Sequence, residues 1–268
     1  MEGLNWLISP KGRGPVVVCL HGFLGGPDDW SEFAVALAAR RPGIGVAAPA
    51  LPMLWAGGIV PPARLAGDLE QALMHEGVSS AILAGYSMGG RAGLEITLRK
   101  PERFPEFVGI STTGGLETFG ERQERRATDS RLAARMRSGN WREFLDYWWR
   151  QPVFCSPKRD LDPPSDYLTT RLRLNPSLMA DWLEAWSPGR LESQWENLAR
   201  YRGRTLWIAG SEDSKYVRES RRLNQTCIDS RSVVIAGCGH QLLREAPKEL
   251  AFAVESFISE RIFHQGSS

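Results

Sequence analysis

A serine in a tight strand-to-helix turn is the strongest chemical signal in the sequence. Ser87 stands in a G-x-S-x-G motif between a predicted buried strand and an amphipathic helix, in the run Ala81-Ile-Leu-Ala-Gly-Tyr-Ser-Met-Gly-Gly90. Such a turn strains the serine backbone and projects its hydroxyl at the carboxyl edge of the sheet. Gly85 and Gly89 are needed because a Cβ there would collide with neighbouring backbone. The motif therefore predicts that Ser87 is a nucleophile or a base.

An activated serine needs a partner that accepts its proton, and the chain has four histidines. His75 lies at a predicted helix end, which is typical of a capping residue, and His264 lies in a polar tail. His21 follows the first strong predicted strand. His240 follows the last strand and precedes the final helix, so it can reach back over the sheet edge. We therefore predict that His240 is the general base.

An acidic residue is expected after the predicted strand Thr205–Ala209, where the chain reads Gly210-Ser-Glu-Asp-Ser214. Asp213 is the preferred candidate and Glu212 is its rival. The carboxylate would hold the imidazole tautomer and stabilise the imidazolium. The chain order serine, aspartate, histidine is that of the α/β hydrolases and differs from the other serine-triad folds.

A glycine-rich loop, His21-Gly-Phe-Leu-Gly-Gly26, follows the first strong predicted strand. Such a loop can direct backbone N–H groups at a developing oxyanion, so we predict an oxyanion hole made by the Phe23 and Met88 amides. A simple glycine turn is the alternative. The sequence has no phosphate loop, HExxH or GxGxxG motif, so we expect neither a metal nor an organic cofactor.

Short apolar runs alternate with amphipathic stretches along most of the chain. The runs that read as buried strands are Val16–Leu20, Ile44–Ala48, Ala81–Ala84, Phe107–Ile110, Thr205–Ala209 and Ser232–Ala236. The stretches that read as helices are Trp30–Arg40, Ala63–Glu76, Gly89–Lys100 and Ala246–Ile262. This alternation predicts an α/β fold with a mostly parallel central sheet and helices on both faces.

One segment breaks the alternation. Residues 113–200 contain no convincing strand but hold six of the ten tryptophans. Two amphipathic helix patterns occur there: Trp141, Phe144, Leu145 and Trp148, and then Leu178, Met179, Trp182, Leu183 and Trp186. We predict a helical cap at 113–200 inserted in a core made of residues 1–112 and 201–268. The alternative is that these aromatic residues only pack the insert onto the core.

Composition excludes several classes of protein. The 268 residues are 42% hydrophobic and 24% charged, which is typical of a globular chain. The net charge of +2 gives no basic surplus for nucleic acid. No apolar run reaches the roughly 18 residues of a membrane span, no signal peptide is recognisable, and the four cysteines are scattered. We expect a cytoplasmic enzyme, most simply a monomer, that acts on a small molecule.

From His21 to His240 the chain resembles an α/β-hydrolase-fold protein. More narrowly, it resembles the family of 2-succinyl-6-hydroxy-2,4-cyclohexadiene-1-carboxylate synthases of menaquinone biosynthesis. The likeness rests on four segments: Gly85–Arg91 (GYSMGGR), Glu124–Asp129 (ERRATD), Trp148–Phe154 (WWRQPVF) and Gly210–Lys215 (GSEDSK). The second and third lie in the predicted cap, where hydrolases usually diverge. One departure is Ala48–Trp55, where the family usually has an Asp-Leu-Pro-Gly-His-Gly type loop that borders the pocket.

This resemblance implies a lyase that eliminates pyruvate from an enolpyruvyl cyclohexene. Ser87 would remove the ring proton α to the succinyl ketone, and the enolate oxygen would lie in the amide hole. Ester hydrolysis needs the same activated serine and the same hole. A serine carboxylester hydrolase acting on a small acidic or aromatic ester therefore remains the alternative, and a non-catalytic binding protein is a third reading.

The family substrate carries three carboxylates, which arginine can bind bidentately. Arg91 lies one helical turn beyond Ser87, on the same face. The resemblance also implies carboxylate binding by Arg125 and by Arg171, with Arg173 a rival to the latter. Arg125 and Asp129 are also spaced as an ordinary helical ion pair. The remaining residues expected to contact substrate are Tyr86, Trp148 and His21.

Overall fold

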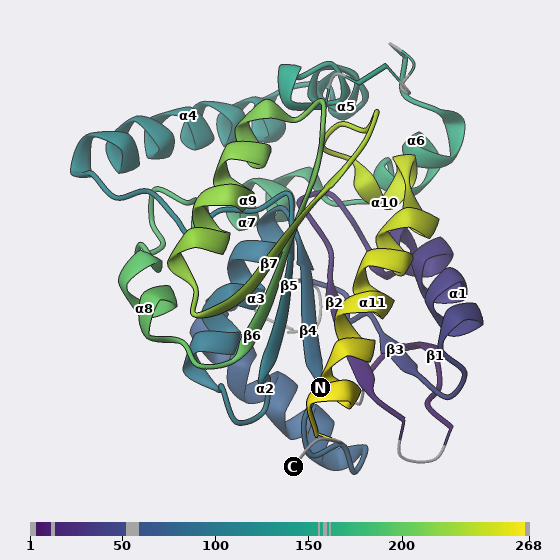
Figure 1. Ribbon diagram of the computed structural model, residues 1–268. Coiled ribbons are helices and arrows are strands. Elements are labelled where there is room, and N and C mark those ends of the chain that lie inside the picture. The colour runs from purple at the N-terminus through teal and green to yellow at the C-terminus, as the bar shows by residue number, and fades with distance from the viewer. Residues whose placement is uncertain are drawn as a thin grey trace.

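The computed structural model describes residues 4–11, 14–51, 59–154, 156–157, 160 and 162–265, and only the backbone of 62–63 and 261–265. The described residues form one seven-stranded sheet in the order β1-β3-β2-β4-β5-β6-β7 (Figure 1). The strands are β1 Trp6–Ile8, β2 Val16–Leu20, β3 Gly45–Ala47, β4 Ile82–Tyr86, β5 Glu106–Ile110, β6 Arg204–Gly210 and β7 Asp229–Ile235. Strands β2 to β7 pair in parallel, as predicted, because the chain passes from each of them to the next through a crossover rather than a hairpin.

The sheet differs from the prediction at its two edges. Strand β1 was not predicted; it pairs antiparallel with β3, and its three side chains are only partly buried, so it lacks a buried apolar run. Strand β7 begins at Asp229, three residues before the predicted Ser232, since its first residues are polar and partly exposed. In the interior, β2 and β5 are buried at every residue, which is typical of parallel strands covered on both faces.

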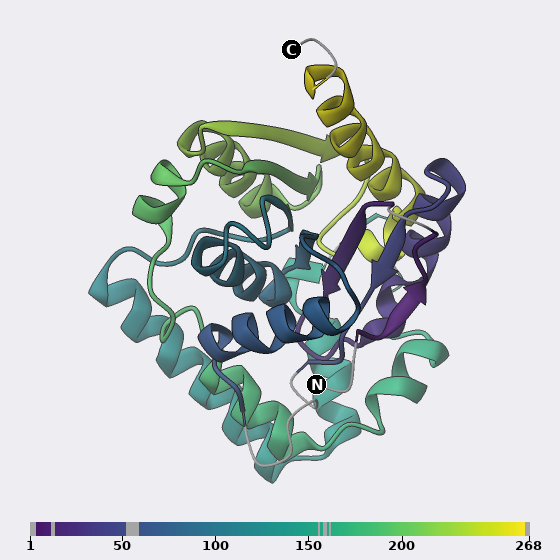
Figure 2. The same cartoon turned by 90° about the horizontal axis from the view of Figure 1, so that it is seen from below.

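Helices cover both faces of this sheet (Figures 1 and 2). On one face α1 packs against α11, and on the other α2 packs against α3 while α9 packs on β6 and β7. Their bounds are α1 Ser31–Arg40, α2 Pro62–His75, α3 Met88–Arg99, α9 Ser214–Thr226 and α11 Pro247–Gln265, with the short α10 at Leu242–Glu245. The four predicted core helices are confirmed, and α9 was not predicted.

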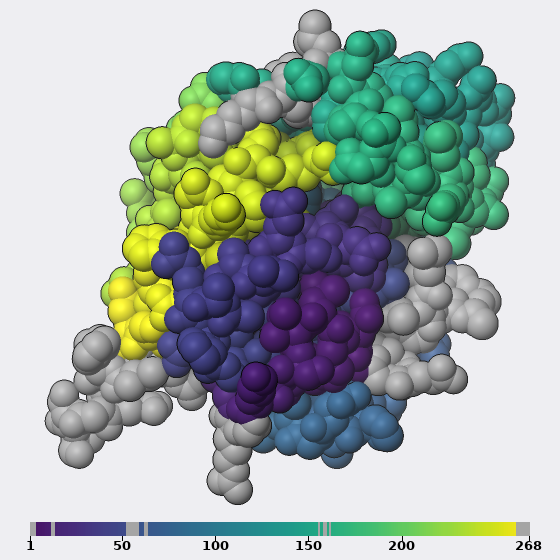
Figure 3. Space-filling view, turned by 90° about the vertical axis from the view of Figure 1, so that its right-hand side faces the viewer, coloured from purple at the N-terminus to yellow at the C-terminus, as the bar shows by residue number. Residues whose placement is uncertain are grey.

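The inserted segment, residues 113–200, has five α-helices in its described part, between β5 and β6. They are α4 Phe119–Ser138, α5 Trp141–Trp149, α6 Ser165–Arg171, α7 Pro176–Ala185 and α8 Trp195–Arg200. The two aromatic patterns correspond to α5 and α7. In Figure 1, α4, α5 and α6 lie beyond the carboxyl ends of the strands, and Figure 3 shows the teal and green surface of this segment above α1 and α11. Trp182 and Leu183 share one buried apolar cluster with Leu20 and Leu24, so the inserted segment is continuous with the core.

Two features are absent from the described part of the chain. None of its helices is both long enough and apolar enough to cross a membrane. Its His, Cys, Asp and Glu side chains form no group of three that could hold a metal ion. The second half of the divergent loop at 48–55 lies outside the described residues, which leave out 52–58.

Candidate active site

Ser87 occupies the single residue between β4, which ends at Tyr86, and α3, which begins at Met88. Its backbone has φ +52° and ψ −111°, a conformation that side-chain-bearing residues rarely adopt. Two hydrogen bonds hold it there: the Ser87 N–H donates to the Ile110 carbonyl (2.9 Å), and the Thr112 hydroxyl donates to the Ser87 carbonyl (3.1 Å). The strained serine turn expected from the motif is therefore present.

The glycines of the motif permit close packing of this turn. A Cβ on Gly85 would lie 2.5 Å from the Gly89 carbonyl oxygen, and a Cβ on Gly89 would lie 2.3 Å from the Leu20 carbonyl oxygen. Both distances are far below van der Waals contact, so only glycine fits. The second contact also places the start of α3 against the end of β2, where the glycine-rich loop begins.

Of the three residues predicted as a triad, His240 lies between the other two and contacts both. His240 Nε2 is 3.0 Å from Ser87 Oγ, and His240 Nδ1 is 2.6 Å from Asp213 Oδ2. His240 and Asp213 are buried, whereas Ser87 is partly exposed. A proton on Nδ1 would donate to the carboxylate and leave Nε2 free to accept from the serine hydroxyl. Asp213 makes this contact, while its rival Glu212 is exposed and accepts from the Ser211 hydroxyl.

Aromatic rings surround the imidazole of His240. The ring centroids of Tyr216, Tyr86 and Phe154 lie 4.8, 5.5 and 5.7 Å from it. Burial raises the pKa of Tyr86 well above its usual value, so its phenol is neutral at neutral pH. Tyr216 and Phe154 were not predicted as site residues. The sequence signal for Tyr216 is its spacing: it lies three residues after Asp213, in the first turn of α9, and is therefore close to the triad.

The amides predicted to form the oxyanion hole are free to donate. Neither the Phe23 nor the Met88 N–H has a hydrogen-bond acceptor within the described residues. Met88 is the first residue of α3, where helix amides lack intrahelical partners. Phe23 precedes Leu24, whose φ of +59° is again unusual for a residue with a side chain. Such strained residues cluster at functional sites, and Leu24 and Ser87 each lie just beyond the carboxyl end of a strand.

His21 is buried and holds the glycine-rich loop. Its Nδ1 lies 2.9 Å from the Gly22 carbonyl oxygen, and its Nε2 accepts from the Leu51 N–H at 2.8 Å. Burial lowers its pKa, so the ring is neutral. With both nitrogens engaged by backbone, His21 positions the loop and has no ring nitrogen available for a ligand.

Arg91 is the most unusual charged residue of the site. Only 8% of it is exposed, and its Nε is buried without a hydrogen-bond partner. Within the described residues no carboxylate pairs with it. Burial, aided by the nearby positive charge of Arg125, lowers its pKa from 12.5 to about 10. Arg91 therefore remains a cation at neutral pH, and no carboxylate among the described residues forms an ion pair with it, although the negative charge of Asp129 acts on it from nearby.

The two other predicted arginines are paired with carboxylates. Arg125 Nε is 2.9 Å from each carboxylate oxygen of Asp129, whose side chain is only 1% exposed. This is the helical pair that the spacing allowed, although its acid is buried rather than on the surface. Arg171 Nη2 donates to Asp29 Oδ1 at 2.5 Å, and the rival Arg173 is exposed.

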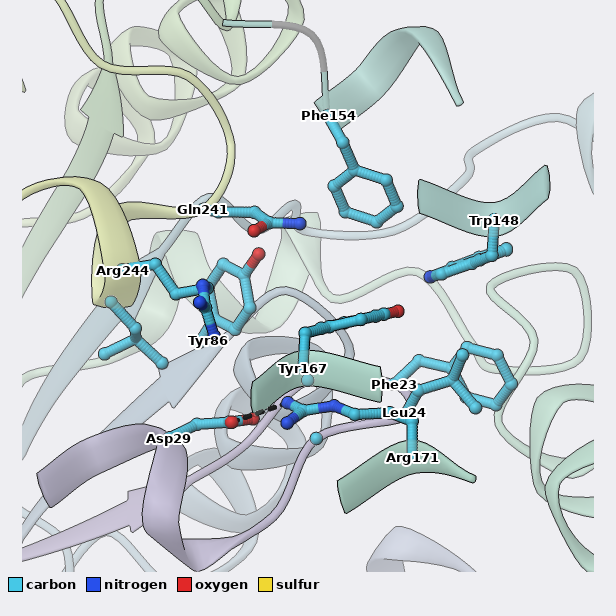
Figure 4. Close-up of a pocket in the computed structure, with 13 residues that line it drawn as sticks. Phe23, Leu24, Asp29, Tyr86, Trp148, Phe154, Tyr167, Arg171, Gln241 and Arg244 are labelled. Atoms are coloured by element: carbon cyan, nitrogen blue, oxygen red, sulfur yellow. Dashed lines mark hydrogen bonds and ion pairs between the residues drawn. The ribbon is translucent and has the colours of Figure 1, made fainter. Parts of the chain in front are cut away.

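A pocket with a cavity volume of about 50 Å³, open to solvent on one side, lies between the glycine-rich loop and the inserted segment. Figure 4 shows three of the residues expected to contact substrate, Arg171, Tyr86 and Trp148, facing this pocket together with aromatic side chains from both sides. Its other lining residues are Gly22, Phe23, Leu24, Gly25, Asp29, Phe154, Tyr167, Gln241, Leu243 and Arg244. Arg91 and Arg125 are not in this lining. The structure thus brings Arg171, Tyr86 and Trp148 together and places the other two arginines apart from them.

Serine, histidine and aspartate side chains in contact at the carboxyl edge of a parallel sheet are typical of α/β enzymes that use a serine as nucleophile or base. A family model described as the alpha/beta hydrolase family matches residues 17–254, and the chain belongs to that family. Within it, the chain is 30% identical to the 2-succinyl-6-hydroxy-2,4-cyclohexadiene-1-carboxylate synthase of Citrobacter koseri, over 87% of this chain and 89% of the relative. That identity and coverage group the chain with these synthases.

Solved structures show the same fold. MenH from S. aureus superposes with a TM-score of 0.86 at 23% identity, covering 97% of this chain and 99% of that one. A thermophilic esterase from Thermogutta terrifontis superposes with a TM-score of 0.75 at 19% identity, covering 94% and 91%. At 23% and 19% identity, these superpositions establish a common fold and nothing further.

Proposed function

We propose that this protein eliminates pyruvate from 2-succinyl-5-enolpyruvyl-6-hydroxy-3-cyclohexene-1-carboxylate and forms 2-succinyl-6-hydroxy-2,4-cyclohexadiene-1-carboxylate in menaquinone biosynthesis. The names of its sequence relatives support this reaction. The observation that carries it is Arg91, a buried and unpaired cation one helical turn from Ser87. Burying an unpaired charge is costly, so a retained one indicates an anionic ligand.

The triad supplies the proton transfer. Ser87 Oγ removes the proton α to the succinyl ketone while its own proton moves to His240 Nε2, 3.0 Å away. Asp213 stabilises the imidazolium that forms. Negative charge develops on the ketone oxygen, where the free Phe23 and Met88 amides stabilise the enolate. The enolate then collapses back to the ketone, the ring double bond shifts, and the bond between ring carbon C5 and the enolpyruvyl oxygen breaks. The departing enolpyruvate takes the proton from His240 on its oxygen and then ketonises to pyruvate.

The inserted segment acts as a cap in this proposal. It brings Arg171 and Trp148 to the pocket from above, and its Arg125 adds a cation near Arg91. The proposed substrate is therefore a small anion held between the core at 1–112 and 201–268 and the cap at 113–200. We also propose that a monomer suffices, because the triad and the pocket come from one chain.

The deciding experiment is pyruvate release from freshly generated substrate, compared with an enzyme-free control and with cleavage of a short-chain aryl ester. Pyruvate release with weak ester cleavage supports the lyase. Ester cleavage without pyruvate release above the control would overturn the lyase and assign the triad to a carboxylester hydrolase.

Replacing Arg91 with methionine should lower activity and raise stability together. Loss of a charge-assisted contact to a substrate carboxylate should lower kcat/KM for pyruvate formation about 10- to 100-fold. Removing a buried, unpaired cation should raise the free energy of unfolding by about 2 kcal/mol. Steady-state pyruvate assays and urea unfolding measure the two effects.

Arg99→Met is the matched control, because Arg99 lies on the same helix but its side chain is 51% exposed and pairs with Glu95. It should leave pyruvate formation within about twofold of the wild type, as expected for a surface ion pair. Wild-type pyruvate formation by Arg91→Met would show that Arg91 contacts no substrate carboxylate.

A further inference from the structure

The carboxylate of Glu245 accepts hydrogen bonds from the loop that carries His240. Glu245 is the last residue of α10, five residues after His240. Its Oε2 accepts from the Gly239 N–H at 2.7 Å, and its Oε1 accepts from the Gln241 N–H at 3.2 Å. The amides on both sides of His240 are therefore held by the same ionised group. Hydrogen bonds to a charged acceptor are about twice as strong as neutral ones.

The inserted segment reaches the same carboxylate. The Ser156 hydroxyl donates to Glu245 Oε2 at 2.5 Å. Phe154, two residues earlier, packs its ring edge against the His240 imidazole. One short stretch of this segment thus contacts both the histidine and the carboxylate that holds its loop. The loop's backbone has further polar contacts, among them one from the Ser111 hydroxyl to the His240 carbonyl at 3.3 Å and one from the Glu212 N–H to the Cys238 carbonyl at 2.9 Å.

We propose that Glu245 is a positioning residue of the triad, which fixes His240 between Ser87 and Asp213 by holding the two amides beside it. This inference rests on the proposed catalytic role of the triad but not on which reaction the triad serves. The imidazole must keep two contacts at once, 3.0 Å to the serine and 2.6 Å to the aspartate. A misplacement of about 1 Å can lower a rate by about 100-fold.

Two variants test separately the hydrogen bonds from Glu245 to the loop amides and the hydrogen bond from Ser156 to Glu245. Glu245→Gln keeps the size of the side chain, but its NH₂ group would face one of the two amide N–H groups and lose that hydrogen bond. Ser156→Ala removes the link to the inserted segment and leaves both amides held. Glu249→Gln is the matched control, because Glu249 is an exposed glutamate at the start of the following helix.

The experiment measures the rate at which diisopropyl fluorophosphate labels Ser87, followed by intact mass, together with kcat and KM for pyruvate release and the Tm. The labelling rate reports how well His240 activates Ser87 and needs no natural substrate. We expect Glu245→Gln to lower both the labelling rate and kcat about 10-fold with KM within about twofold. We expect Ser156→Ala and Glu249→Gln to stay within about threefold of the wild type in labelling.

The outcomes distinguish this inference from the proposed function. If wild-type Ser87 is not labelled, the triad is not an activated one and the proposed function fails with it. If the wild type is labelled but Glu245→Gln is labelled equally fast, the positioning role alone is overturned. A lower Tm with an unchanged labelling rate would make Glu245 merely structural. An equal fall in Ser156→Ala and Glu245→Gln would assign the effect to the inserted segment rather than to the held amides.

Discussion

Ser87→Ala is expected to lower pyruvate formation roughly 1,000-fold or more while leaving the Tm nearly unchanged. The hydroxyl is the proton acceptor of the proposed reaction, and the other triad members cannot replace it. Structurally the substitution removes one side-chain contact, to His240 Nε2 at 3.0 Å, from a residue that is partly exposed. The backbone hydrogen bonds to Ile110 and Thr112 that hold the strained turn remain.

The measurement is single-turnover pyruvate release, with circular dichroism melting of the same samples. Ser79→Ala is a suitable control, because Ser79 is an exposed serine in the loop before β4 and should keep wild-type activity. A Ser87→Ala protein that keeps more than a tenth of the wild-type rate would show that another group removes the proton.

The triad could be predicted from sequence because its geometry follows from the topology of the sheet. Ser87, Asp213 and His240 each lie just beyond a strand: β4, β6 and β7. The carboxyl ends of parallel strands meet at one edge, so residues 153 positions apart come into contact there. Glycine at 85 and 89 fixed the serine turn, which is a local property.

The partners of the polar residues could not be predicted in this way. Arg171 pairs with Asp29, 142 residues away, and His21 accepts from the Leu51 amide. Both contacts depend on how the inserted segment and a loop pack on the core. A local sequence pattern does not predict this packing. The residue type alone says that Arg91 is a cation, but the three-dimensional structure is needed to show that its side chain is buried and that its Nε has no hydrogen-bond partner.

Some helices of the inserted segment could be predicted from sequence and others could not, depending on how much of their surface is buried. Helices α5 and α7 carry wide apolar stripes and were predicted, because one face of each packs into the core. Helix α4 is rich in arginine and has only three buried residues, so its long exposed surface gives a weak periodic signal. It is stabilised instead by the Thr118–Glu121 capping box at its start and by packing on α7.

Asp213→Asn is expected to lower pyruvate formation about 100- to 10,000-fold, because an amide in this position can donate to His240 Nδ1 and favour the wrong tautomer. The fold should survive, since Asp213 is also the N-cap of α9 and asparagine caps a helix equally well.

Glu212→Gln separates the two acidic candidates that the sequence left open. Glu212 is exposed, and the only hydrogen bond of its side chain among the described residues is from the neighbouring Ser211 hydroxyl, so its amide variant should keep activity within about twofold. The two variants differ from the wild type by one charge each and lie at adjacent positions, so a general effect of charge would lower both rates alike. Rates of pyruvate release and of Ser87 labelling should both fall in Asp213→Asn alone, because the 2.6 Å contact to His240 belongs to that residue. Equal losses in both variants, or a loss in Glu212→Gln alone, would contradict the assignment of Asp213 as the residue that orients the imidazole.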